Sequence, residues 1–285
     1  MAAMTDRTDQ GFAYLPPAAA GLGQAFARPR LMAWGCIVVL TALGWLALGL
    51  MTSSGDGPSG AFAVICRPAI GPLSAADVAL VASMWAAMVL AMMLPSAAPM
   101  ILTYAQIADT AARKGERIVT PLMLAAGYAA VWLGFAAAAT VTQLALTRAA
   151  LLNSGLAAAS GLFAGAIFIA AGLYQFSALK QACLNQCRHP FPFFFSNWAT
   201  TPRGVFRLGL KQGVFCVGCC WAMMLVMFAV GVMNVVWMAG LGIVMAIEKI
   251  GTGRWFTRAV GIALILAGLA FVLSEFAGHW PGHAI

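Results

Sequence analysis

The 285-residue chain is 62% hydrophobic and only 8% charged, which excludes an ordinary soluble domain because such domains carry about a quarter charged residues. Its net charge of +8 at pH 7 does not indicate nucleic-acid binding, because the basic residues lie between apolar runs, where membrane topology places them. The composition predicts an all-α fold, a polytopic bundle of transmembrane helices.

The charges of the chain set the expected spans. Residues 1–30 are polar and then rich in proline and glycine, and we expect a flexible cytoplasmic tail without a cleavable signal. Six later runs contain no Asp, Glu, Lys or Arg: 31–55, 78–108, 118–147, 149–179, 212–247 and 259–274. A straight helix needs about 20 residues to cross a bilayer core of about 30 Å.

The run 212–247 is too long for one span, because a single straight helix of that length would measure roughly 54 Å at about 1.5 Å per residue. Gly231 and Asn234 lie inside it, and this pair suits a tight turn. We therefore expect two helices, near 208–230 and 233–248. The chain then has about seven spans.

The distribution of basic residues supports seven spans with the N-terminus in the cytoplasm. Only Arg67 and Arg148 then fall outside, and the other 14 of the 16 basic residues fall inside. The inside set is Arg7, Arg28, Arg30, Arg113, Lys114, Arg117, Lys180, Arg188, Arg203, Arg207, Lys211, Lys249, Arg254 and Arg258. With six spans the last three would move outside. We expect a transmembrane domain over 31–276 and a short external tail over 277–285.

The expected spans lack the chemistry of several common classes of membrane protein. The first six contain no carboxylate or basic residue in mid-membrane, and Glu275 lies near the outer end of the seventh. Proton-coupled carriers and channels usually need such groups. No Walker, dinucleotide-binding or His-Glu-x-x-His motif is present either. We therefore do not expect a proton-driven carrier, an ion channel, or an enzyme that uses one of these motifs.

Methionines and prolines mark the second expected span. Met84, Met88 and Met92 are spaced four apart and share one helix face. Pro95 and Pro99 follow, and a proline inside a helix predicts a kink because it removes a backbone donor. The alternative is that methionine only fills irregular gaps in the bundle.

Six of the seven cysteines lie on the expected cytoplasmic side, and five of these form two motifs. Cys216, Cys219 and Cys220 fall on one helix at spacings of three and four, in a ladder that continues through methionines to Met227. Cys183 and Cys187 are four apart in the preceding segment. These spacings suit a metal if the long intervening loop folds back. The alternative is that the cysteines pack as small hydrophobic residues.

The sulfur ligands define the expected metal. Thiolates and thioethers together favour Cu(I), and thiolates alone also suit Zn(II). We expect Cu(I), with Zn(II) as the second candidate. The predicted ligands are Cys183, Cys187, Cys216, Cys219, Cys220, Met88 and Met92.

These motifs resemble a bacterial family of integral membrane proteins, domain of unknown function 2182. The family is described as predicted metal-binding, and some members are labelled copper chaperones. The matching pieces include Met84-Trp85, Ala91-Met92-Met93-Leu94-Pro95-Ser96, Tyr174-Gln175, Cys183-Leu184, Gly218-Cys219-Cys220-Trp221 and Glu248-Lys249. The resemblance covers roughly residues 75–275 and implies a location in the bacterial inner membrane.

Three functions follow as hypotheses. The first is a copper-handling membrane protein that binds Cu(I) for delivery, insertion or passage. Its partners would be the lipid bilayer and a copper-receiving protein or membrane complex. The second is a membrane thiol–disulfide oxidoreductase using Cys216 and Cys219, which a Cys-x-x-Cys motif permits. The third is a structural or assembly subunit of a membrane complex.

Reporter fusions test the expected topology. A fusion after residue 251 should report the cytoplasm and a fusion at the C-terminus should report the periplasm, because basic loops stay inside. Enzymatic reporters active on only one side of the membrane measure this. If both fusions report the same side, the seven-span prediction is wrong.

Overall fold

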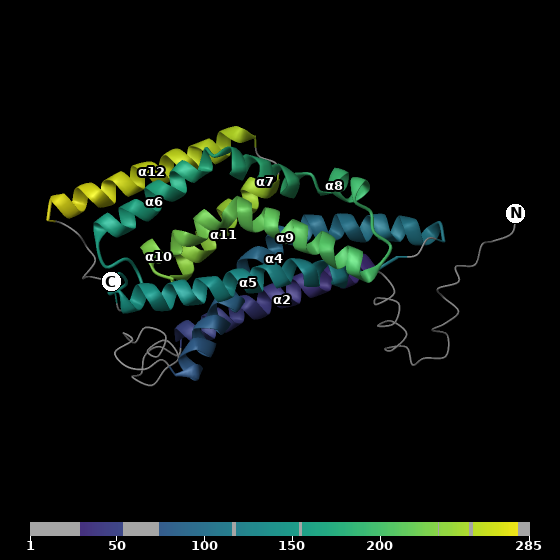
Figure 1. Ribbon diagram of the computed structural model, residues 1–285, viewed down its shortest axis with the longest axis horizontal. Helices are drawn as coiled ribbons and strands as arrows, with labels where there is room; N and C mark the ends of the chain where they lie inside the picture. Colours follow the sequence, from purple (N-terminus) through teal and green to yellow (C-terminus); the bar gives the residue numbers. More distant parts are fainter. Residues whose placement is uncertain are drawn as a thin grey trace, which may run out of the picture.

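The computed structural model describes residues 29–53, 74–115, 118–153, 156–232, 234–250 and 253–278, and this part of the chain is a bundle of α-helices (Figure 1). The all-α prediction is confirmed for the described residues, which contain no β-structure beyond an isolated bridge between Leu152 and Ala158. The predicted tails lie outside the described residues, apart from 29–30 and 277–278. The helices are α2 (Pro29–Ser53), α4 (Ala75–Arg113), α5 (Pro121–Arg148), α6 (Gly161–Gln175), α7 (Ala178–Arg188), α8 (Pro190–Ser196), α9 (Pro202–Leu225), α10 (Met227–Val230), α11 (Val235–Ile250) and α12 (Arg254–Phe276).

Several helices are long and apolar enough to cross a membrane. Four pass by length and composition: α4, α5, the continuous stretch Pro202–Val230, and α12. The pair α6 and α7 adds a fifth if it counts as one span bent by 64°. The seven-span prediction also needs α2, where the shorter apolar stretch is Ile37–Leu50, and α11, which has 16 residues. That number stays a prediction.

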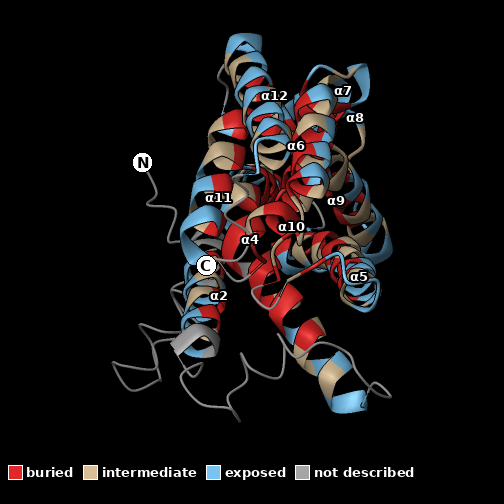
Figure 2. Ribbon diagram, turned by 90° about the vertical axis from the view of Figure 1, so that its left-hand side faces the viewer, coloured by how far each residue is buried: buried red, intermediate tan, exposed pale blue. Residues whose placement is uncertain are grey.

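The centre of the bundle is formed by α4 and by α9 with α10. Among the apolar windows of the candidate spans, 59% of residues are buried in α4 and 61% in Pro202–Val230, against 17% in α12. Figure 2 shows the same contrast, with α4 and α10 mostly buried and α12 largely exposed. The sulfur-rich segments therefore belong to the two most enclosed helices, and α12 lies at the periphery.

The chain reverses where the sequence predicted a turn. Gly231 has a φ of +101°, a conformation that favours glycine. Asn234 follows it and accepts a hydrogen bond from the backbone N–H of Trp237 at the start of α11. Lys249 at the far end of α11 then contacts Cys216 of α9, so α11 runs back along α9. The predicted division of 212–247 into two helices is confirmed.

The charge-free run 149–179 does not form one continuous helix. Helix α6 begins only at Gly161, and residues before it form a turn containing the Leu152–Ala158 bridge. The side chain of Asn153 accepts a hydrogen bond from the N–H of Ala157 at 3.0 Å. Such bonds compete with helix formation, which explains why the apolar run does not continue as helix.

Helix α4 continues through both of its prolines. A proline at position 95 has no N–H to donate, which leaves the carbonyl of Ala91 without its usual helical partner. The indole N–H of Trp45 in α2 donates to this carbonyl at 3.1 Å. A neighbouring helix therefore satisfies the backbone group that Pro95 frees, as membrane helices with prolines require.

Glycines allow two helix pairs to approach closely. A Cβ atom on Gly127 of α5 would lie 2.2 Å from the carbonyl oxygen of Phe206, and one on Gly209 of α9 would lie 2.2 Å from that of Leu124. The peripheral pair α6–α12 is built the same way, with Gly165 against the carbonyl of Gly268 at 2.8 Å. Small residues at helix contacts are the usual basis of packing in membranes.

The α5–α9 contact predicts unequal costs for the same substitution at two positions of α5. Gly127→Ala should destabilise the protein by about 1–3 kcal/mol, because its methyl group would overlap the backbone of α9. Gly134→Ala is the matched control, because nothing lies within 4 Å of the added atom. Thermal midpoints of the detergent-purified proteins measure the difference, and equal midpoints would contradict the observed packing.

Candidate metal centre

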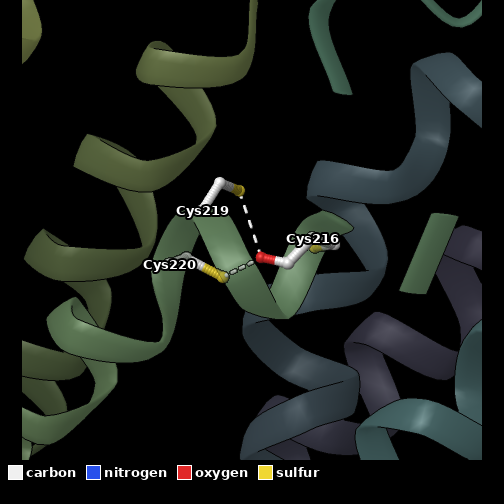
Figure 3. A group of neighbouring side chains, drawn as sticks. All are labelled: Cys216, Cys219 and Cys220. Carbon is white, nitrogen blue, oxygen red and sulfur yellow. Dashed lines mark hydrogen bonds between the residues drawn. The ribbon is translucent and has the colours of Figure 1, made fainter. Parts of the chain in front are cut away.

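Three cysteine side chains of α9 converge inside the bundle. Their spacings of three and four residues put Cys216, Cys219 and Cys220 near one another, and their sulfur atoms all lie within 4.8 Å (Figure 3). All three are at most 3% exposed. The predicted convergence of these residues is therefore observed in the structure.

The thiols of this group share one backbone acceptor. Cys219 donates to the carbonyl oxygen of Cys216 at 3.1 Å and Cys220 donates to the same oxygen at 2.9 Å. Figure 3 shows both side chains turned toward it. This carbonyl satisfies two weak donors in an apolar interior, where unpaired polar groups are costly.

Helix α7 brings the second pair of cysteines to α9. The sulfur of Cys187 lies 4.0 Å from that of Cys219. Cys183 lies against Gly218, where an added Cβ would be 2.6 Å from its sulfur. The segment between α7 and α9 contains the short helix α8. The contact between Cys187 and Cys219 shows that this segment folds back, as the predicted ligand set requires. The structure therefore brings Cys187 to the α9 group and places Cys183 beside Gly218 of the same helix.

A methionine outside the predicted ligand set also reaches the site. The sulfur of Met93 lies 3.8 Å from that of Cys220. Met88 and Met92 are buried on the same helix, and the side chain of Met92 lies against Gly242 of α11. The sequence shows Met92 and Met93 side by side. The prediction followed the spacing of four residues from Met84, which includes Met92 and leaves out Met93.

Two polar side chains outside the predicted ligand set contact Cys216. The ammonium of Lys249 lies 3.1 Å from its sulfur, and the hydroxyl of Tyr128 lies 3.0 Å from it. Lys249 also donates to the hydroxyl of Ser96 at 2.8 Å. We expected Lys249 in a cytoplasmic loop, but α11 extends to Ile250 and buries this side chain against α9.

A buried ion pair fixes α7 against α11. The ammonium of Lys180 lies 2.8 Å from a carboxylate oxygen of Glu248, and both side chains are almost fully buried. Arg188 adds a bond of 2.7 Å from its Nε to the Glu248 carbonyl. A buried pair is costly to break because one charge is left alone. These contacts hold the helix that carries Cys183 and Cys187 in place.

The donor set suits a soft metal. Four cysteine sulfurs and one thioether lie close together. In the described part of the chain, no carboxylate or histidine contacts these sulfur atoms. Zinc bonded to sulfur at about 2.3 Å would need sulfurs about 3.8 Å apart in a tetrahedron. The sulfurs of the α9 group lie within 4.8 Å of one another, so the side chains would have to close by up to about 1 Å around such an ion. Soft sulfur donors are also the preferred ligands of Cu(I).

The comparisons with known proteins point to copper. The model of a family called PpoB2, described as copper chaperone, matches residues 82–271, which are 190 of the 285 residues. The matched region contains all seven predicted ligands and also Met93 and Lys249. No curated protein and no solved structure matches the chain. The copper-chaperone label that the resemblance implied is confirmed by this match.

Mild oxidation tests the approach of α7 to α9. Diamide treatment of metal-free protein should join Cys187 to Cys219, because their sulfurs are 4.0 Å apart and lie on different helices that can shift together. Peptide mapping by mass spectrometry identifies the pair. Cys187→Ser should abolish the product and Cys183→Ser should retain it. A main product joining Cys216 to Cys219 would contradict this geometry.

Proposed function

Because the chain belongs to the copper chaperone family, we propose that it is an integral membrane protein that binds Cu(I) and passes it on. The observation that supports this proposal is the contact between half-buried Cys187 of α7 and the buried cysteine group of α9. The copper ion is cargo in this proposal. Delivery to a partner, insertion into a protein and passage across the membrane all require such a soft site.

The proposed ligands are the five cysteines of α7 and α9 together with methionines of α4. Cys216, Cys219, Cys220 and Cys187 form the central group, and Cys183 lies one turn from Cys187. Met88 and Met92 act as soft ligands within the bundle, and Met93 joins them because its sulfur lies 3.8 Å from that of Cys220. Methionine binds Cu(I) without losing a proton, which suits an apolar interior.

The proposed setting is the inner membrane of a bacterium, with seven spans and a cytoplasmic N-terminus. The candidate domain is 31–276, between the two tails. Lys180, Arg188 and Lys249 all lie close to the cysteine group. The positive-inside tendency then puts the cysteines toward the cytoplasm. A copper-receiving protein or membrane complex would meet the site from one side of the bilayer.

One observation favours a second function. Cys187 and Cys219 are close enough to form a disulfide after a small shift of α7. A membrane thiol–disulfide oxidoreductase would use such a pair. It predicts a redox-active protein that carries no stoichiometric metal, whereas the copper proposal predicts a reduced protein that binds one.

Replacing two central cysteines tests the copper proposal. Cys216→Ser with Cys219→Ser should remove most bound Cu(I) while the fold persists. A hydroxyl at position 219 can bond to the carbonyl one turn back as the Cys219 thiol does, and one at position 216 can still bond to Tyr128 and Lys249. Elemental analysis and thiol alkylation of anaerobically purified protein measure metal and free thiols. Metal affinity should also weaken as the pH falls, because thiols must lose protons to bind.

The matched control replaces Cys36 and Cys66 by Ser, since neither belongs to the proposed ligand set. It should keep the metal. Two further variants are Met93→Leu and the double substitution Met88→Leu with Met92→Leu. Both should weaken Cu(I) binding, because Leu keeps the volume without the sulfur, and neither should weaken Zn(II) binding by cysteines alone. Wild-type protein that takes up no stoichiometric copper or zinc under reducing conditions would sink the proposal.

A further inference from the structure

Lys249 has an unusual position among the buried side chains. It lies in the last turn of α11, is 7% exposed, and directs its ammonium at Cys216. Its other hydrogen bond goes to Ser96, a neutral hydroxyl of α4. A lysine that needed only to reach water would extend along the bundle surface instead. This ammonium is aimed at the sulfur group.

The charge of Lys249 has no carboxylate to balance it in the described part of the chain. The ion pair found there joins Lys180 to Glu248, the residue adjacent to Lys249. Glu248 therefore serves the other lysine, and the contacts of Lys249 are a thiol and a hydroxyl. A buried ammonium without a counter-charge is strongly disfavoured. The negative charge that balances the Lys249 ammonium therefore has to be carried by the cysteine sulfur atoms.

The charge of Lys249 favours a copper–thiolate complex over a zinc–thiolate complex. For the same number of thiolate ligands, the Cu(I) complex is one charge more negative than the Zn(II) complex, because the copper ion itself carries one positive charge less. The ammonium of Lys249 beside Cys216 therefore stabilises the Cu(I) complex more. Electrostatic interactions are strong in such an interior, so this difference favours the monovalent ion.

We propose that Lys249 is the countercation of the Cu(I)–thiolate complex at Cys216 and that it biases the site toward a monovalent soft metal. The inference rests on the proposed copper function. The lysine binds no metal itself. Its ammonium offsets the negative charge of the complex at Cys216, and Ser96 holds this ammonium in place.

Competition titrations test the role of this charge. Cu(I) affinity is measured anaerobically against bicinchoninate, and Zn(II) affinity against a chromogenic zinc chelator, on detergent-purified full-length protein. Lys249→Met should weaken Cu(I) binding by about 10- to 100-fold, the range typical of groups that support metal ligands. Zn(II) binding should weaken less or strengthen, so the preference for copper narrows. Lys249→Arg keeps the charge and should stay near wild type.

The matched control is Lys211→Met, which removes the same charge from an exposed position on α9. It should leave both affinities unchanged. If Lys249→Met does not fold, Lys249→Gln keeps a hydrogen-bond donor without the charge and should give the same selective loss. Equal losses for both metals, or an unchanged Cu(I) affinity, would overturn the inference. Failure of the wild type to bind Cu(I) would instead overturn the proposed function.

Discussion

The structure around the site depends on how one buried thiol is surrounded. Cys216 of α9 is contacted by Tyr128 from α5 and by Lys249 from α11, and its carbonyl oxygen accepts from two further thiols of its own helix. Three helices therefore meet at one residue. Because buried polar groups must find partners, a shift of any of these helices would leave one of them unsatisfied. This requirement fixes the helices that define the sulfur group.

The second constraint acts on α7. This helix has 11 residues and a polar composition, so the burial of its few apolar side chains is not enough to hold it in place. The buried pair of Lys180 with Glu248 joins it to α11, and Arg188 adds a bond to the same residue. Glu248 and Lys249 are neighbours, so one turn of α11 both anchors the helix that carries Cys187 and directs a positive charge at Cys216. The cysteines of two motifs that are far apart in sequence are joined through this turn.

Much of this arrangement could be predicted from the sequence because it depends on local spacing. The group of Cys216, Cys219 and Cys220 follows from helical periodicity, and the reversal at Gly231 follows from the length of an apolar run. Met93 could not be chosen over Met92, because the rotation of α4 is set by its packing against other helices. Lys249 was treated as a marker of topology, since a charge at the end of a span looks the same in sequence whether it faces water or sulfur. The late start of the helix in the run 149–179, at Gly161, also depends on a side-chain bond that composition does not reveal.

The proposed Cu(I) site inside the helix bundle is coordinated by sulfur. It can be tested by X-ray absorption at the copper edge of wild-type protein loaded with one equivalent of Cu(I) under anaerobic conditions. We expect a Cu(I) edge with a first shell made of sulfur alone, because the converging side chains are cysteines and a methionine. A first shell dominated by nitrogen or oxygen, or copper that washes off with a weak chelator, would contradict it.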